Sequence, residues 1–73
     1  MYYRDNVFLK RFGQRLRDIR KEKGISQEEL AGKTGFELSQ IGRIERGEIN
    51  TSLSHVSAIA KALKMSVKEL FDF

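Results

Sequence analysis

The sequence predicts an all-α fold, a compact bundle of five short helices. Three observations carry this prediction. The chain contains no proline, so no helix interior is interrupted. It shows no long apolar–polar alternation typical of a strand, and no Asn-Gly or Asp-Gly pair typical of a tight hairpin. Its apolar residues instead recur at helical spacings, and capping residues and glycines separate the periodic stretches.

The first three helices have clear limits. The first is expected over residues 6–23, which carry one apolar stripe made of Phe8, Phe12, Leu16 and Ile19. Gly24 is placed to end it in a left-handed conformation. The second begins at Ser26, which forms a capping box with Glu29, and Gly35 ends it. The third is expected over residues 37–46, with Gly47 as its stop.

Two more helices follow. The fourth is expected to begin at residue 51 or 52 and to end near residue 63, with an inward set of Leu53, Val56, Ile59, Ala60 and Leu63. The fifth is short, because a second capping pair, Ser66 with Glu69, is followed only by Leu70 and Phe71 before the last two residues. No heptad pattern persists, so the helices are expected to cross rather than to form a coiled coil.

Length and composition bound the possible functions. The 73 residues are expected to form a single domain, residues 1–73. With no cysteine and one histidine, neither a metal site nor a cofactor is expected. No stretch resembles a membrane span or an export signal, so a cytoplasmic protein without a membrane partner is expected. The 14 Lys and Arg outnumber the 10 Asp and Glu, which favours a polyanionic partner. No nucleophile, base and oxyanion-binding set is visible, so the chain is not expected to be an enzyme.

Residues 26–47 are expected to form two helices joined by a very short turn. Gly35 allows a positive φ there, and so short a link forces the helices to cross steeply, as in a helix-turn-helix. On a helical wheel, Ile41 and Ile44 lie inward, and the opposite side carries Ser39, Arg43 and Arg46. Such a side suits the major groove of B-DNA, where arginine can bridge base acceptors. It also suits a solvated surface, and the residues alone leave both interpretations open.

The stretch SQEELAGKTGFELSQIGRIERGE resembles the helix-turn-helix of the Cro/repressor (Xre) family of bacterial and phage regulators. The resemblance covers residues 12–71, and SLSHVSAIAKALKMSVKELF is similar to the last two helices of the family. It implies a five-helix domain of the phage-repressor type and a transcriptional regulator that binds double-stranded DNA as a homodimer. Restriction-modification controller proteins, small phage-type repressors and antitoxins are the classes it suggests at this size.

The resemblance also implies roles for individual residues. The third helix is expected to enter the major groove and to read bases with Leu38, Ser39, Gln40 and Arg43. The DNA backbone is expected to contact Gln27, Arg46, Asn50 and Thr51. A structural ion pair is expected between Arg20 and Glu45, in a half-exposed position. Relatives often have Ser or Thr where this chain has Glu37, and a polar residue where it has Leu38, which instead suits a thymine methyl group.

Two apolar chain ends remain as candidate contact surfaces. Phe71 is expected beside Leu70 in the core, and Phe73 has little left to pack against, so a dimer interface is expected around Phe71 and Phe73. Tyr2 and Tyr3 are the next candidates. A homodimer would read two half-sites of a palindromic operator, and no small-molecule ligand is expected. The alternative is a protein-interaction module, antitoxin-like or regulator-binding, that uses the C-terminal apolar surface.

Overall fold

The computed structural model describes residues 3–73 and confirms the all-α prediction. Its helices are α1 (Asn6–Glu22), α2 (Gln27–Thr34), α3 (Leu38–Glu45), α4 (Leu53–Ala62) and α5 (Val67–Leu70). No strand occurs between residues 3 and 73. The candidate contact at Tyr2 lies outside the described residues. Within the described part of the chain, every helix is too short or too polar to cross a membrane.

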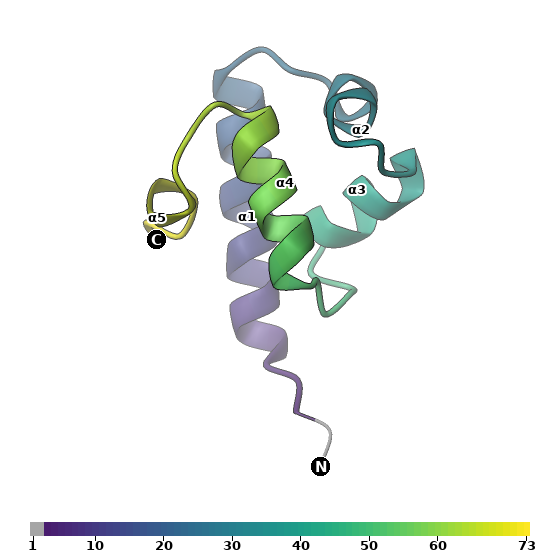
Figure 1. Cartoon of the computed structure of the whole chain (residues 1–73). Helices are drawn as coiled ribbons and strands as arrows, with labels where there is room; N and C mark the ends of the chain where they lie inside the picture. The colour runs from purple at the N-terminus through teal and green to yellow at the C-terminus, as the bar shows by residue number, and fades with distance from the viewer. Residues whose placement is uncertain (1–2) are drawn as a thin grey trace.

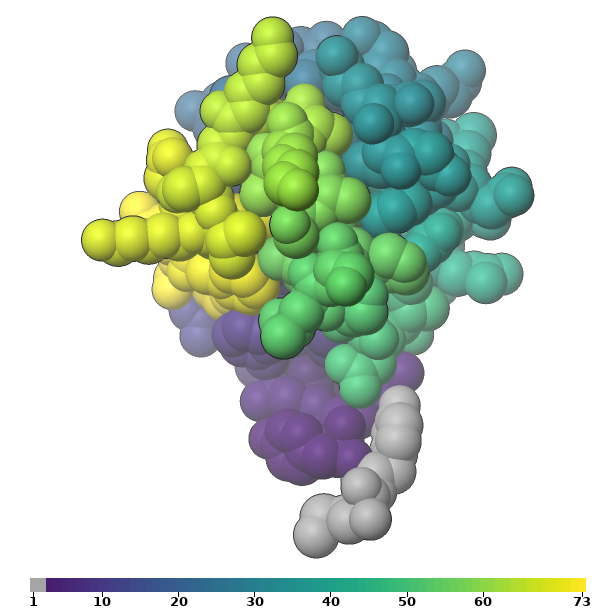
Figure 2. Space-filling view, in the orientation of Figure 1, coloured from purple at the N-terminus to yellow at the C-terminus, as the bar shows by residue number. Residues whose placement is uncertain are grey.

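α1 is the longest helix, and α4 lies in front of it in Figure 1. In this view α2 and α3 lie on one side of α1 and α4, and α5 lies on the other side. α3 packs against both α1 and α2, while α4 packs against α2 and α5. Figure 2 shows the same order on the surface, with α4 between α5 and α2. The helix-turn-helix pair, α2 and α3, is therefore supported by α1 and α4. The side of the pair that faces away from these two helices is exposed to solvent.

Local signals define the helix ends, and some of them were predicted. The carboxylate of Asp5 accepts the backbone N–H of Phe8 at 3.0 Å and caps α1. Both predicted capping boxes form, Ser26 with Glu29 at α2 and Ser66 with Glu69 at α5. These side chains satisfy backbone N–H groups that have no partner inside the helix.

The buried core follows the predicted apolar stripes, with two corrections. It consists of Phe12, Leu16, Ile19, Leu30, Ala31, Ile41, Ile44, Val56, Ile59, Ala60, Leu63 and Leu70. Leu53 was expected inside but is 85% exposed, because it is the first residue of α4 and projects beyond the packed part of the helix. Phe8 is 44% exposed, because the first turn of α1 extends past the core, and Phe71 and Phe73 cover its ring in part.

Candidate nucleic-acid interface

Only residues 35–37 separate α2 from α3. Gly35 has φ of 78° and donates its N–H to the carbonyl oxygen of Ala31 at 2.9 Å, which closes the last turn of α2. The hydroxyl of Thr34 donates to the Leu30 carbonyl at 2.9 Å and accepts the N–H of Phe36 at 3.2 Å. The turn is thus fixed by its own hydrogen bonds, and α3 begins in a defined direction. Glu37 at its N-cap makes no side-chain cap.

α3 has the two faces that the wheel predicts. Ile41, Ile44 and Glu45 are buried, whereas Leu38, Ser39, Arg43 and Arg46 are exposed. Gly42 is also buried, because the side chain of Arg46 lies back along the helix over it: a Cβ on Gly42 would stand 3.0 Å from Nη1 of Arg46. The exposed face therefore begins with the apolar Leu38 and the small, polar Ser39. Toward its end it carries the guanidinium groups of Arg43 and Arg46.

The last turn of α3 lies directly against the backbone of α1. A Cβ on Gly13 would stand 2.7 Å from the carbonyl carbon of Glu45 and would overlap the carbonyl oxygens of Ile44 and Glu45. No real Cβ contact is that short, so the two helices approach as closely as they do only because residue 13 is glycine. This contact fixes the position of α3 relative to α1.

Glu45 anchors the same end of α3 through its side chain. The Glu45 carboxylate accepts Nε and Nη2 of Arg20 at 2.6 and 3.1 Å. The same guanidinium donates Nη1 to the Ile25 carbonyl oxygen at 3.0 Å. A bidentate arginine–carboxylate pair of this kind is both strong and directional. The structure therefore brings together the two residues that the family resemblance suggested as a pair.

The position of this pair differs from the half-exposed one that was expected. The whole-residue exposure is only 8% for Arg20 and 4% for Glu45, because α1, α2 and α3 converge on them. Burial alone would raise the pKa of the Glu45 carboxyl, but hydrogen bonds from Arg20, Gln27 and Arg17 together hold that pKa below its usual value. The hydrogen bond to Glu45 raises the pKa of Arg20, so both groups stay charged.

Gln27, a predicted backbone contact, also bonds to Glu45. Its Nε2 donates to Oε1 of Glu45 at 2.9 Å. A carboxylate only accepts hydrogen bonds, which requires the amide nitrogen of Gln27 to face it. The second N–H of that nitrogen remains available. Gln27 is half-buried at the first position of α2, so its amide is oriented before any ligand arrives.

The segment after α3 is held by contacts to the end of α3 and to the N-terminal part of the chain. Arg46 donates Nε to Oε2 of Glu48 at 2.8 Å in an exposed ion pair. Arg4 donates Nη2 to the carbonyl oxygen of Glu48 at 2.6 Å. Gly47 lies so close to α1 that a Cβ there would stand 2.7 Å from Cα of Lys10. The loop is thereby tied to the first turns of α1.

Gln40, a predicted base-reading residue, lies at the edge of the exposed face. It is half-buried, and its Nε2 is 3.4 Å from Nδ1 of His55. The ring of His55 meets the edge of Phe36, with 4.7 Å between ring centroids. His55 is itself half-buried, and these contacts join α4 to the side of α3.

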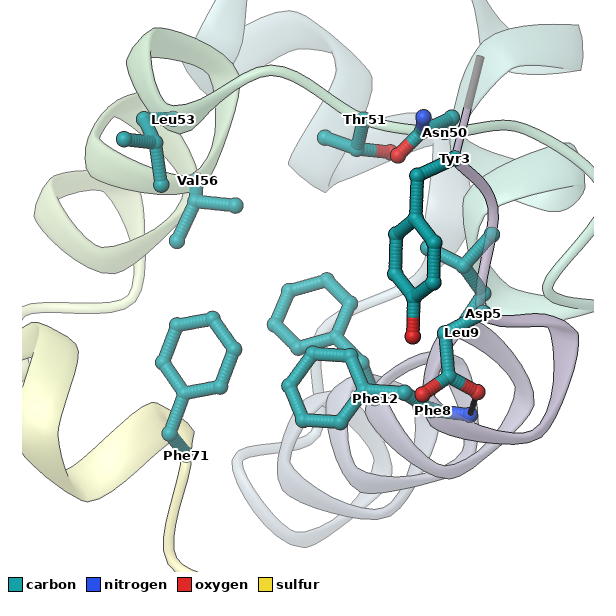
Figure 3. A pocket seen from close by; sticks show the side chains of 10 residues that line it. All are labelled: Tyr3, Asp5, Phe8, Leu9, Phe12, Asn50, Thr51, Leu53, Val56 and Phe71. Carbon is teal, nitrogen blue, oxygen red and sulfur yellow. Dashed lines mark hydrogen bonds between the residues drawn. The ribbon is translucent and has the colours of Figure 1, made fainter. Parts of the chain in front are cut away.

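Asn50 and Thr51, two predicted backbone contacts, line a cavity of about 200 Å³ (Figure 3), and Asn50 is also exposed to solvent. Tyr3, Phe8, Phe12 and Phe71 contribute rings to the same cavity, and Leu53 and Val56 contribute from α4. The hydroxyl oxygen of Thr51 is buried without a hydrogen-bond partner among residues 3–73. A buried hydroxyl is not open to a phosphate, so a contact of Thr51 with the DNA backbone would have to use its main-chain N–H, and this contact stays a prediction.

Phe73 also has more neighbouring side chains within the chain than expected. Its ring lies 5.5 Å from that of Phe8 and 6.1 Å from that of Phe71, and the Arg11 guanidinium stands 5.2 Å from its centroid. The ring is still 40% exposed. The expectation that Phe73 has little to pack against was wrong, because the first turns of α1 supply Phe8 and Arg11 and α5 is followed by Phe71.

A family model described as helix-turn-helix matches residues 16–70, more than half of the chain. The chain belongs to this helix-turn-helix family. The match includes the tight turn and the whole of α2 and α3. It confirms the suggested Xre-type resemblance and makes the chain a member of a family of DNA-binding transcriptional regulators.

Similar proteins place this helix-turn-helix chain among small regulators. Control protein C.BamHI of Bacillus amyloliquefaciens is 44% identical over 63 residues, which cover 85% of this chain and 78% of that protein. The transcriptional regulator SinR of Bacillus subtilis is 41% identical over 61 residues, 82% of this chain and 55% of SinR. The restriction-modification controller protein C.AhdI of Aeromonas hydrophila has a solved structure with a TM-score of 0.87 and 46% identity, covering 89% and 98% of the two chains. These relatives are regulators rather than enzymes.

Sequence reasoning missed three residues of the helix-turn-helix surface. Arg17 bonds to Glu45, Glu48 pairs with Arg46, and His55 meets Gln40. Arg17 had a usable signal, since it stands three residues before Arg20 and so shares its face of α1. The contact between His55 and Gln40 had none, because it joins two different helices and depends on how they pack.

Proposed function

We propose that this helix-turn-helix protein binds double-stranded DNA in a sequence-specific manner, with α3 in the major groove, and regulates transcription as a homodimer. The observation that carries the proposal is the division of α3. One face is fixed by a close backbone contact and a buried ion pair, and the other is exposed and carries Leu38, Ser39 and Arg43. A rigid helix with an exposed, partly basic face fits the dimensions of the groove.

The exposed residues of α3 match the chemistry of base edges. Arg43 stands at the centre of the face. Its side chain makes no hydrogen bond to any other residue between 3 and 73. Its guanidinium is therefore available to donate to both O6 and N7 of a guanine. Leu38 suits a thymine methyl group, and the Ser39 hydroxyl can donate or accept. Gln40 reaches the groove from the edge of the face, beside His55.

Contacts to phosphates fix the orientation of the helix without selecting a sequence. Gln27 at the start of α2 and Arg46 at the end of α3 both lie near the last turn of α3, because Gln27 bonds to Glu45, the residue before Arg46. Asn50, exposed in the following loop, is the third proposed contact. Together they would hold the DNA backbone beside the groove while the residues of α3 read the bases.

The proposed dimer uses the aromatic surface on the side of α5, which consists of Phe8, Phe71 and Phe73. Phe8 and Phe73 are partly exposed there, and Leu53 is almost fully exposed at the rim of the cavity in Figure 3. One short helix reads too few base pairs to select a site in a genome, so two copies are needed. Because α5 lies across α1 and α4 from α3, an interface there leaves both copies of α3 free to bind (Figure 1).

Selection of bound sequences from a random duplex pool tests the proposal. The expected product is a palindrome whose half-site centres lie about 10 base pairs, or about 34 Å, apart. Affinity for the selected site should fall on the order of a thousandfold or more between about 50 and 200 mM salt if a dimer contacts about six to ten phosphates. If the protein is not retained on duplex DNA at low salt, the alternative holds, a protein-interaction module that uses the aromatic surface.

A further inference from the structure

We infer that Arg17, together with Gln27, forms a phosphate clamp that contacts the DNA backbone beside α3. This inference rests on the proposed DNA-binding function and adds a contact from α1 to the interface. The clamp is organised by the buried carboxylate of Glu45, which bonds to both side chains through the same oxygen atom, Oε1.

The charges at Glu45 do not balance. One carboxylate faces two guanidinium groups, those of Arg17 and Arg20, so the cluster carries one excess positive charge. The Glu45 side chain is 0% exposed and that of Arg20 is 10% exposed, whereas that of Arg17 is 37% exposed. The excess charge is therefore accessible to a ligand only at Arg17, and the ligand that it favours is an anion.

The hydrogen-bonding groups of Arg17 are also largely unused. It reaches Glu45 through Nε alone, at a long 3.4 Å, and neither Nη atom bonds to any residue described between 3 and 73. Arg20 already holds Glu45 by two shorter bonds. Arg17 is thus unnecessary for satisfying the buried carboxylate, and its two terminal nitrogens can donate to another group.

Gln27 completes the clamp. Its amide nitrogen and Nε of Arg17 meet at one oxygen of Glu45, so the two side chains lie next to each other between α1 and α2. The remaining N–H of Gln27 and the terminal N–H groups of Arg17 give adjacent donors for the oxygens of one phosphate. Glu45 is then a positioning residue, since it holds both donors but touches no ligand.

The experiment measures the salt dependence of affinity for the selected site and for random duplex DNA in three variants. Arg17→Gln removes the accessible charge. Arg17→Lys keeps that charge but lacks the Nε group that bonds to Glu45. Lys61→Gln is the matched control, because it removes one exposed charge from the last turn of α4.

For Arg17→Gln, the slope of log affinity against log salt should decrease by about 0.9 for each phosphate that the protein no longer binds, or about 1.8 for a dimer. Affinity at about 0.1 M salt should fall roughly tenfold per phosphate on both DNAs, and the selected sequence should not change. Arg17→Lys and Lys61→Gln should keep the slope. The melting temperature of Arg17→Gln should stay close to that of the original protein, because the pair of Arg20 and Glu45 is intact.

Other outcomes would overturn the inference. An unchanged slope in Arg17→Gln would show that Arg17 meets no phosphate. An equal decrease of the slope in Arg17→Gln and Arg17→Lys would show that the positive charge at residue 17 is not what binds the phosphate. A changed base preference would make Arg17 a reading residue. If the original protein binds no duplex DNA, the proposed function fails as well, and this result is distinct from selective failure of the clamp.

Discussion

Arg46 and Glu48 form an exposed ion pair at the end of α3, with 2.8 Å between Nε and Oε2. The hydrogen bond from Arg46 lowers the pKa of the Glu48 carboxyl, which keeps it negatively charged. Arg46 is also a proposed phosphate contact. In the free protein a carboxylate therefore occupies the position where a DNA phosphate would bind, and the two anions compete for one guanidinium.

Replacing Glu48 by Gln should strengthen DNA binding. The variant frees Arg46 and removes a negative charge next to the phosphates, so affinity for both selected and random DNA should rise several-fold at low salt and less at high salt. Titrations at several salt concentrations measure this. The control is Glu22→Gln, which removes an exposed charge from the last turn of α1. An equal gain in the control would mean that net charge, and not the competition for Arg46, is responsible.

Arg43 and Arg46 should have different effects when each is replaced by Ala. Arg43 projects from the centre of the exposed face, so its loss should cost about 1–3 kcal/mol on the selected site and relax the preference at one base position. Arg46 lies at the helix end, so its loss should weaken selected and random DNA alike. Competition binding against a set of single-base variants distinguishes these patterns. Equal losses on all sequences in both variants would contradict the role assigned to Arg43.

Breaking the pair of Arg20 and Glu45 should destabilise the fold strongly. The pair is buried, so replacing either residue by Ala leaves the other charge without its partner, at about 3–5 kcal/mol of unfolding free energy. The double variant should lose less than the sum of the single losses. Denaturant unfolding of the four proteins gives the coupling energy. Additive losses would argue against a direct interaction.

The same pair should make the protein sensitive to acid. The folded-state pKa of Glu45 lies below its ordinary value of 4.5, so its contribution to stability is fully present above that value. That contribution should disappear as the pH falls through the lowered, folded-state pKa. The unfolding free energy of the original protein, measured between about pH 7 and pH 2, should therefore decrease more steeply than that of Glu45→Gln. Parallel curves would show that other carboxyl groups account for the acid sensitivity.

The proposed dimer can be tested at Leu53. An aspartate at this exposed position should leave the fold unchanged, and it should weaken dimerisation because a charge would be buried between the two copies. Sedimentation should show a monomer, and binding to the palindrome should be lost, while circular dichroism stays the same. Val7→Asp is the control, since Val7 is also exposed but does not line the cavity. If Leu53→Asp remains dimeric, the interface lies elsewhere, with Phe73→Asp as the next variant to examine.

The limits of the helices could be predicted because the signals that define them are local. Ser26 and Glu29, or Gly35 alone, act on backbone groups only a few residues away, and such short-range relationships are visible in the sequence. The inward and outward faces of α3 followed for the same reason. The family resemblance then supplied the expected pairing of Arg20 with Glu45, which periodicity does not reveal.

Contacts between distant elements could not be predicted in this way. Leu53 fits the apolar pattern of α4, yet no neighbouring helix extends far enough to cover it. Phe8 is exposed for the same reason. Gln27 and Arg17 share one carboxylate oxygen because α1, α2 and α3 meet there, and no spacing within a single helix contains that information.

The close approach at Gly13 has a consequence for target recognition. The position of α3 is set partly by main-chain atoms of Ile44 and Glu45 against α1, and main-chain atoms are the same for every sequence. Substitutions at Leu38, Ser39 or Arg43 on the opposite face leave this contact untouched. Under the proposed function, single substitutions at these three positions would change the target site while α3 keeps its place on α1. Any side chain at residue 13, in contrast, would push the last turn of α3 away from α1.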